Sequence, residues 1–549
     1  MNIIDQIKNT LNTFLINTFN LSADDIISID ITLNTDEQRQ QFGDLSTNAA
    51  LILSKKIGKN PREIAEIIIK NFSHPLVKKT EIAGPGFINF LLTPEAFVEL
   101  LKELTQQQEN FFKPDHLKPK NFNIEFVSAN PTGPLHFGHG RGGIIGDVLG
   151  NITKFVGYNT IKEFYINDAG SQIQKLGESF KARCYQELGE NMPLPEDGYQ
   201  GEYLVELAKE AVKEFDKQLL KKSDQFFAEY AKEKLLAKLQ QTLKDYGINF
   251  DVWFSEKSLH ENHKIEKAIE RLKQAGFIYE QDGALWFKST AFGDDKDRVL
   301  RKQDGSWTYV AADLAYMLDK AERGAQQMIM VLGQDHHGYV DRLHGLHKAL
   351  GLQQSTLDII LYQLVSLKKD GQELRMSKRA GRMVTLQDII DTVGKDVARF
   401  FYLNRKADAQ LDFDINLALK KTEENPVYYL QYAFVRLNSI LKNAAKYKEL
   451  EQINENDAQY LTEEEHLMLK KIVALKDLLL NITKNYQTHQ LTYYALELAQ
   501  LFHSYYGKNK VIDLEYPERS RARLLLVQQL KMTLSLILKL LGISQPETM

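Results

Sequence analysis

The chain has 549 residues, of which 43% are hydrophobic and 26% are charged, and its formal net charge is −4. A globular chain of this length divides into several domains. The slightly negative charge excludes a uniformly basic nucleic-acid binder, so any RNA contact must use local patches and shape. The single cysteine, Cys184, excludes disulfides within the chain and cysteine-rich zinc sites, and it is typical of a reducing cytoplasm.

Targeting and membrane signals are weak throughout the sequence. The first residues lack the basic region followed by an apolar core that marks a signal peptide. The most apolar segment, 524–543, is interrupted by two lysines and two glutamines, so we expect a core helix and not a membrane span. These features predict a cytoplasmic protein with no membrane partner.

Residues 1–115 are predicted to form a small α+β domain. Apolar residues at helical spacing begin it, and Gly84-Pro-Gly86-Phe87-Ile88-Asn89 indicates a turn that enters a strand. From these patterns alone, the domain could simply pack against its neighbour. The polar run 106–120, which contains two prolines, is interpreted as a linker.

The most informative stretch is 125–146. It begins as a strand, is broken by prolines and a glycine at 130–134, and becomes helical after His136. Four glycines are expected to leave the start of this helix bare: Gly138, Gly140, Gly142 and Gly143. Free backbone N–H groups and the helix dipole would then create an anion site, where His136 and His139 could both reach one phosphate chain.

Residues 121–390 are predicted to form a doubly wound α/β nucleotide-binding domain with insertions. Apolar strands are expected at 161–166, 328–332 and 359–367, and each is followed by a polar, glycine-containing turn. The polar and charged segment near 175–275 is expected to be a helical insertion. Residues 391–549 show the apolar spacing of an all-α helical bundle.

A further pair of candidate residues lies at helical spacing in Tyr309-Val-Ala-Ala-Asp313. Residues four apart share one face of a helix, although a solvated aspartate would give the same pattern. Together with Glu125 they form a phenol and two carboxylates. This set suits a bound guanidinium, which offers five donors in a fork and keeps its charge.

Two motifs carry a resemblance to a known family. The stretch Ser128-Ala129-Asn-Pro-Thr-Gly-Pro-Leu-His136-x-Gly-His139 resembles the first signature of class I aminoacyl-tRNA synthetases, in the spelling of the arginyl family. The motif itself is taken as Ala129 to His139. Arg375-Met376-Ser377-Lys378-Arg379 is similar to the second signature, Lys-Met-Ser-Lys-Ser, at three of five positions, with arginines replacing the first lysine and the last serine.

The resemblance implies a role for each matching residue. The catalytic set would be His136, His139 and Lys378. The ATP-binding set would be His136, Gly138, His139, Gln334, Met376, Ser377 and Lys378. The arginine-binding set would be Glu125, Asn130, His136, Tyr309, Asp313 and Gln334. The tRNA-binding set would be Phe87 and Asn89, at the D-loop, with Tyr429 and Ala433 in an anticodon-binding bundle. A core role for Phe87 is an equal alternative.

The implied activity is ligation of L-arginine to its tRNA in two steps. Arginine attacks the α-phosphate of Mg²⁺-bound ATP to give arginyl-adenylate, and the terminal adenosine of tRNA then accepts the arginyl group. The resemblance implies no tightly bound metal and, by analogy with the family, a monomer. Three rivals remain: another class I synthetase, a small-metabolite nucleotidylyltransferase, and a silent RNA-binding module. The carboxylate–phenol set argues against a synthetase for an apolar amino acid. The large helical C-terminal part argues against a nucleotidylyltransferase. The retained histidines and Lys378 argue against a silent module.

Overall fold

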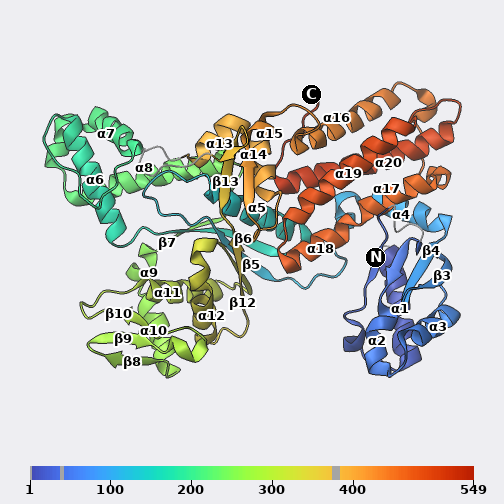
Figure 1. Cartoon of the computed structure of the whole chain (residues 1–549), viewed down its shortest axis with the longest axis horizontal. Coiled ribbons are helices and arrows are strands. Elements are labelled where there is room, and N and C mark those ends of the chain that lie inside the picture. The colour runs from blue at the N-terminus through green and yellow to red at the C-terminus, as the bar shows by residue number, and fades with distance from the viewer. Residues whose placement is uncertain (1–2, 37–41, 374–383) are drawn as a thin grey trace.

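The computed structural model describes residues 3–36, 42–373 and 384–549, in three parts arranged around a parallel sheet (Figure 1). A small α+β domain comes first, a doubly wound α/β domain with insertions lies at the centre, and a helical bundle follows. The predicted fold class is therefore confirmed.

The N-terminal domain is built on a four-stranded antiparallel sheet of order β1-β2-β4-β3. Its elements are α1 (Ile3–Phe19), β1 (Ile31–Leu33), β2 (Leu45–Thr47), α2 (Ala49–Ile57), α3 (Pro61–Asn71), β3 (Val77–Ala83), β4 (Phe87–Leu92) and α4 (Pro94–Gln107). The run predicted to be a linker differs from the expectation, because it begins with a 3₁₀ turn in which Phe111 and Phe112 are fully buried. The connection is thus packed into the fold at its start.

The central sheet has five parallel strands in the order β12-β11-β5-β6-β7. Its strands and two main covering helices are β5 (Asn121–Phe126), α5 (His139–Val156), β6 (Asn159–Ile166), β7 (Val252–Ser255), α11 (Tyr309–Glu322), β11 (Gln327–Gly333) and β12 (Thr356–Tyr362). The strand order reverses between β5 and β11. In such sheets ligands bind outside the carboxyl ends of the strands at this switch point, which is where β5 leads into α5.

Insertions interrupt this domain twice before α11. The first contains α6 (Ser171–Glu187), α7 (Glu202–Phe215) and α8 (Asp224–Asp245), which form a helical unit on the side away from the bundle (Figure 1). The second lies beyond α9 (Lys257–Glu261) and α10 (Lys264–Gln274). It is an antiparallel sheet that the sequence analysis did not predict, made of β8 (Ile278–Gln281), β9 (Ala284–Phe287) and β10 (Arg298–Arg301).

The strand expected at 359–367 is divided in two. After β12, the chain turns and forms β13 (Val365–Lys369), which leaves the central sheet and pairs with β14 (Gln372–Glu373) and β15 (Leu411–Asp414). The helices that complete this region are η6 (Gln334–Tyr339), α12 (Val340–Ala349), α13 (Leu386–Val393), α14 (Lys395–Leu403) and α15 (Ile415–Leu419).

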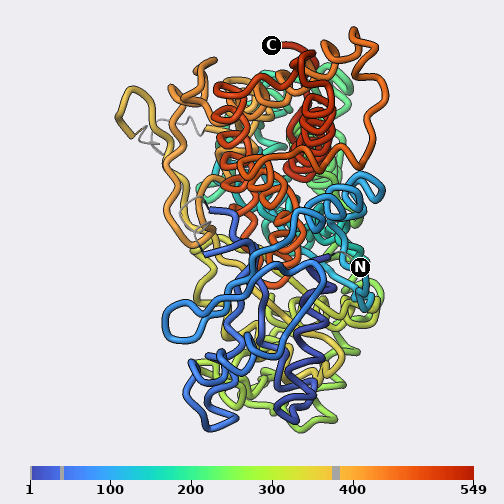
Figure 2. Tube along the Cα trace, turned by 90° about the vertical axis from the view of Figure 1, so that its right-hand side faces the viewer, coloured from blue at the N-terminus to red at the C-terminus, as the bar shows by residue number. Residues whose placement is uncertain are grey.

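The C-terminal bundle consists of α16 (Pro426–Ala444), α17 (Glu463–Val473), α18 (Leu475–Asn485), α19 (His489–Lys508) and α20 (Pro517–Leu541). In the described residues, α20 is the one helix long and apolar enough to cross a membrane, and 72% of its apolar window is buried inside the fold. It is therefore the core helix that the sequence predicts. The N-terminal domain lies against this bundle (Figure 2). The two parts are joined by a buried pair, Lys470–Asp44, at 2.8 Å.

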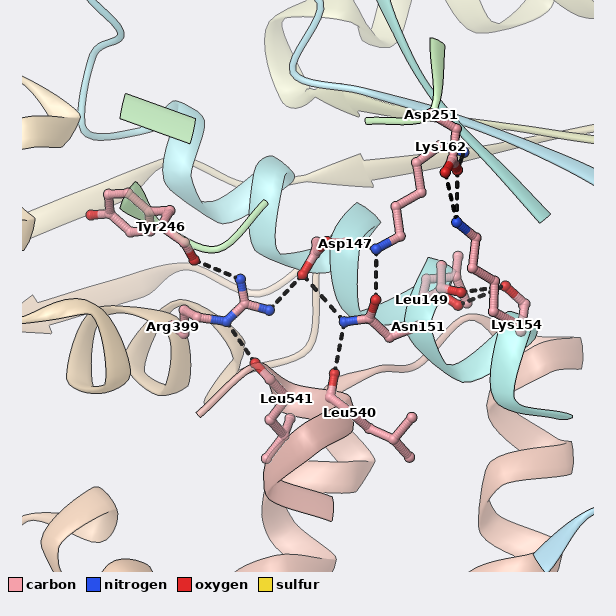
Figure 3. A network of polar contacts seen from close by, with 12 residues as sticks. Asp147, Leu149, Asn151, Lys154, Lys162, Tyr246, Asp251, Arg399, Leu540 and Leu541 are labelled. Carbon is pink, nitrogen blue, oxygen red and sulfur yellow. Dashed lines mark hydrogen bonds and ion pairs between the residues drawn. The ribbon is translucent and has the colours of Figure 1, made fainter. Parts of the chain in front are cut away.

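A buried polar cluster fixes α5 against both neighbouring parts of the chain, and we call it the Asp147 node. Asp147, in the middle of α5, bonds to Arg399 of α14 at 2.6 Å and to Lys162 of β6 at 2.7 Å (Figure 3). Arg399 also donates to the carbonyl oxygens of Tyr246 and Leu541, at 2.8 and 2.6 Å. Through Arg399, the helix that starts at His139 is thus tied to the last turn of α20.

Candidate active site

The turn after β5 contains a pronounced backbone deviation. Val127 and Ser128 have φ angles of 67° and 41°, in the left-handed region that residues other than glycine rarely adopt. The Ser128 hydroxyl donates to Glu125 at 3.1 Å and accepts the N–H of Tyr165 at 3.1 Å. Non-glycine residues in this conformation cost about 1–3 kcal/mol each and cluster at functional sites. The turn therefore marks this strand end as a candidate site.

His136 and His139 are held by backbone N–H groups at the start of α5. The Nδ1 atom of His139 accepts the N–H of His136 at 3.0 Å, and the Nδ1 atom of His136 accepts the N–H of Gly138 at 3.0 Å. In a neutral imidazole this leaves the proton on Nε2, which makes Nε2 a donor. Burial lowers the pKa of His139, so the neutral form is favoured.

The glycines of this helix do not leave its start bare, which corrects the sequence-based expectation. A Cβ atom at Gly140 would lie 2.6 Å from the Tyr402 ring, and one at Gly142 would lie 2.5 Å from the Tyr362 ring. Aromatic side chains therefore cover this part of the helix. Gly140 and Gly142 are therefore needed for close packing, and His136 and His139 are half-buried beside them.

Three carboxylates gather beside the carboxyl end of β5, and we call them the acidic pocket: Glu125, Asp313 and Glu256. Burial, followed by the negative charges of Glu125 and Glu256, raises the pKa of Asp313 to about 7. Burial also raises the pKa of Glu256 to about 7, although a hydrogen bond with Tyr165 opposes the shift. Burial is the main cause of both shifts, and the positive charges of Arg342 and Lys320 offset that of Asp313 only in part.

Glu125 and Glu163 are each paired with a cation, unlike Asp313 and Glu256. Lys320 bonds to Glu125 at 2.5 Å, and Arg323 makes two bonds to Glu163, at 2.6 and 2.9 Å. Across residues 3–36, 42–373 and 384–549, neither Asp313 nor Glu256 forms an ion pair. The pocket is therefore short of positive charge at these two carboxylates.

The other residues predicted to bind arginine lie at the rim. Asn130 is exposed and donates to Gln172 at 2.8 Å. Tyr309 begins α11 and is 55% exposed, one helical turn before Asp313. Gln334 follows β11, the strand beside β5, and is half-buried.

The second signature falls outside the described residues, so Met376, Ser377 and Lys378 are not placed. The segment that follows it is placed beside the first signature. Phe137 donates to the carbonyl of Val384 at 3.2 Å, and Leu386 donates to the carbonyl of Leu135 at 2.7 Å. Residues 384–386, which follow the second signature in the chain, are thus hydrogen-bonded to the first signature.

Two residues predicted to bind tRNA lie on β4. Phe87 is 42% exposed, so the alternative of a core role is not supported. Asn89 is only 7% exposed, although it shares a face of the strand with the exposed Phe87 and Leu91. A direct RNA contact by Asn89 stays a prediction.

The other two lie on α16, a helix that also lines a cavity. Ala433 is fully buried, whereas Tyr429 is half-buried next to His503, and their tRNA-binding roles stay predictions. One turn along, Arg436 lies over the rings of Tyr432 and Tyr506, 4.5 and 5.1 Å from their centroids. These three side chains line a cavity of about 740 Å³.

One acid of the acidic pocket and three neighbouring residues were not predicted from the sequence: Glu256, Tyr165, Tyr316 and Lys320. Tyr316 and Lys320 continue the Asp313 face of α11 at spacings of three and seven, so a helical projection could have found them. Glu256 follows the short strand β7 in a segment interpreted as insertion, and no local pattern distinguishes it.

Three family models match the chain: the "Arginyl tRNA synthetase N terminal domain" at residues 1–92, "tRNA synthetases class I (R), catalytic domain" at 100–412, and the "DALR anticodon binding domain" at 430–549. An arginine–tRNA ligase of Bacillus licheniformis is 41% identical over all of both chains, and one of Citrifermentans bemidjiense is 44% identical over 93% of each. The solved structure of the Thermus thermophilus arginyl-tRNA synthetase has a TM-score of 0.77 over the full length of both chains at 20% identity, which shows the shared fold.

Proposed function

The chain belongs to the arginyl family of class I aminoacyl-tRNA synthetases, and from this premise we propose how its residues divide the reaction. The protein is an arginine–tRNA ligase, which uses ATP to form arginyl-adenylate and then transfers the arginyl group to tRNA. The roles of individual residues, the tRNA contacts and the assembly state are our proposals.

Asp313 and Glu256 hold the guanidinium of arginine. The observation that carries this proposal is the pair of unpaired acids in a pocket whose other acid, Glu125, already has a lysine partner. A guanidinium entering a site without acceptors would lose its hydration for nothing. Here it meets two carboxylates that lack a cation, and its fork can satisfy both. Tyr309 and Asn130, at the rim, are placed to act on the rest of the substrate.

ATP lies across the start of α5, where the Nε2 atoms of His136 and His139 donate to its phosphates. Gly138 permits close approach there, and Gln334 acts from the neighbouring strand. Met376, Ser377 and Lys378 close over the nucleotide from the second signature, with Lys378 following charge onto pyrophosphate. Mg²⁺ enters as part of the ATP complex. The chain positions the reactants and stabilises charge.

Exposed Phe87 stacks on an unpaired base of the tRNA D-loop, as an exposed aromatic on a rigid strand can do. Tyr432, Arg436 and Tyr506 form a pocket for an anticodon base, because two rings and a planar cation offer stacking surfaces. Asn89, Tyr429 and Ala433 support these surfaces from behind.

We further propose the domain boundaries 1–115, 121–390 and 391–549, with a helical insertion near 175–275. The N-terminal sheet, the central sheet and helices α16 to α20 lie within these three ranges, whereas β15 pairs with β13 across the boundary at 390, and the family models place the boundaries elsewhere. A monomeric, cytoplasmic enzyme is proposed as well, and sedimentation of the pure protein tests the assembly state.

Titration calorimetry of arginine and ATP against charge-removing variants tests the guanidinium site. Asp313→Asn and Glu256→Gln each remove one charge-assisted contact, worth about 1.5–3 kcal/mol. We therefore expect arginine to bind on the order of 10- to 150-fold more weakly, with ATP affinity unchanged. Glu322→Gln, an exposed acid on the same helix paired with Lys267, is the matched control and should change neither. Folded Asp313→Asn and Glu256→Gln proteins with wild-type arginine affinity would falsify the assignment.

A further inference from the structure

The helical insertion formed by α6, α7 and α8 is a part of the chain to which the proposed reaction assigns no role. Its buried side chains form a hydrophobic core of their own, which includes Leu176, Phe180, Leu204, Phe227 and Leu235. This core is separate from the cores around the central sheet. The insertion is therefore a separately packed unit, and what it contributes to the rest of the protein depends on the contacts that it makes.

Residues 130–134, which follow β5 and lead to His136, form a loop that we call the signature loop. Pro131 and Pro134 have no backbone N–H group, so this loop has few donors of its own. Within residues 3–36, 42–373 and 384–549, one hydrogen bond reaches its backbone from elsewhere in the chain, and it comes from the side chain of Tyr203. The position of the signature loop therefore depends on the helical insertion.

Tyr203, at the start of α7, contacts the middle of the signature loop. Its hydroxyl donates to the carbonyl oxygen of Thr132 at 2.7 Å, and its ring packs against the core of the insertion. Burial raises the pKa of Tyr203 to about 12, so the hydroxyl keeps its proton and is a donor at neutral pH. Because the ring is held by the core, the hydrogen bond fixes the Thr132 carbonyl relative to the insertion.

Gly133 allows the Tyr203 ring to approach the loop closely. A Cβ atom at this position would lie 3.2 Å from the Cζ atom of Tyr203 and 3.3 Å from its hydroxyl oxygen. Carbon atoms in good contact lie about 3.5–4.0 Å apart, so an alanine here would displace the ring. The glycine of the motif is therefore matched to the tyrosine of the insertion.

A second contact from the insertion holds the first residue of the signature loop. The side-chain amide of Asn130 donates to Gln172, at the start of α6, at 2.8 Å. Asn130 is proposed to act on arginine, whereas His136, beyond the other end of the loop, is proposed to act on ATP. The insertion therefore holds the segment that sets the separation between these two groups.

We propose that Tyr203 is a positioning residue, through which the helical insertion holds the signature loop so that the groups acting on arginine and on ATP are aligned for adenylate formation. This inference rests on the proposed roles of Asn130 and His136. Misplacement of reacting groups by about 1 Å can cost on the order of 100-fold in rate. Tyr203 touches neither substrate in this arrangement and acts through the loop alone.

Tyr203→Phe tests the proposal, because it removes the hydroxyl and leaves the ring in place. The rate at which labelled arginine becomes arginyl-tRNA in a single turnover should fall about three- to tenfold, the size of one neutral hydrogen bond. The Kd values of arginine and ATP, measured by calorimetry, and the Tm should remain those of the wild type. An unchanged rate overturns the proposal, as does a loss of rate that parallels a fall in Tm.

Tyr185→Phe is the matched control for this substitution. The Tyr185 hydroxyl also donates to a backbone carbonyl, that of Leu220 at 3.3 Å, but both residues lie inside the insertion. The control should therefore retain the wild-type rate. A loss of rate equal to that of Tyr203→Phe would overturn the proposal, because the effect would then not depend on the signature loop.

Gly133→Ala tests the same contact from the side of the loop. The φ angle of Gly133 is not positive, so alanine adds no backbone strain there. It should lower the rate by displacing the Tyr203 ring, and it should have no further effect in Tyr203→Ala, which has no ring to displace. An equal effect in both backgrounds overturns the proposal. Failure of the proposed roles of Asn130 and His136 is distinguishable, since Asn130→Ala and His136→Ala would then keep the wild-type rate.

Discussion

Two groups of buried acids in the central domain show what positive charge does to a carboxylate. Burial alone would raise the pKa of Asp147, but Arg399 and Lys162 outweigh it and hold the pKa below the usual range (Figure 3). Asp313 is half-buried, and burial together with the negative charges of Glu125 and Glu256 outweighs Arg342 and Lys320 and raises its pKa to about 7. In the Asp147 node the protein supplies both counter-ions. In the acidic pocket it leaves a cation to be supplied by the substrate.

The difference separates stability from function within one domain. A buried acid with two bonded cations fixes helices in place, because moving either partner exposes an unpaired charge. A buried acid without a cation destabilises the empty protein and gains its partner only on binding, which is a common feature of active sites. Removing a charge from the Asp147 node should therefore destabilise the protein, whereas removing one from the acidic pocket should stabilise the unliganded protein.

Breaking the Asp147 node should have the largest effect. Arg399→Met leaves Asp147 with Lys162 alone and removes donors from two carbonyl oxygens, so we expect a loss of about 3–5 kcal/mol in the free energy of unfolding. Urea denaturation followed by circular dichroism measures it. Arg399→Met with Asp147→Asn should be less damaging than Arg399→Met alone. Equal losses in both variants would mean that the cost comes from packing and not from charge.

Acidification should weaken the acidic pocket and leave the node intact. Carboxyls with pKa values raised to about 7 are ionised above that pH and protonated below it, and only the ionised forms attract a guanidinium. Arginine affinity should therefore fall about tenfold per titrating group between pH 8 and pH 6, as the pH passes through 7. Calorimetry at several pH values checks this, with ATP as the comparison ligand. A flat arginine profile that persists in Asp313→Asn would contradict the assignment.

The smallest expected effect is a gain in stability from the same substitution that harms binding. At pH 8 the ionised Asp313 opposes folding, because its pKa is raised in the folded state, so Asp313→Asn should stabilise the unliganded protein by about 0.5–2 kcal/mol. A rise in Tm at pH 8 that shrinks at pH 6, where Asp313 takes up a proton, is the expected pattern. A lower Tm at both values would place Asp313 among the stabilising residues.

Sequence periodicity predicted the parts of the site that lie on one element. Asp313 was found from its spacing to Tyr309, and α5 was found from the helical pattern after His136. The partners of these residues could not be found in this way. Lys320 and Glu125 are 195 residues apart, and they meet only because α11 packs on the face of the sheet that carries Glu125.

Short elements and glycines account for the other differences. The strands β8, β9 and β10 have four residues each, too few for a clear alternation, so their sheet was not predicted. The glycines of α5 were read as space for a ligand. The rings of Tyr362 and Tyr402 that fill that space come from distant parts of the chain.

The Asp147 node also sets an order of events during synthesis on the ribosome. Asp147 and Arg399 are 252 residues apart, so at about 5–20 residues per second the arginine is made roughly 13–50 s after the aspartate. The acceptor of Asn151, on the same helix, is made later still, because it is the carbonyl oxygen of Leu540, 389 residues further along the chain. The nascent central domain therefore holds an incompletely paired acid until α14 has been made, and Asn151 and Arg399 lack their carbonyl acceptors until α20 has been made. A chain cut within α20 would contain every proposed active-site residue and still lack the carbonyl contacts of Leu540 and Leu541 that help to hold their main helix in place.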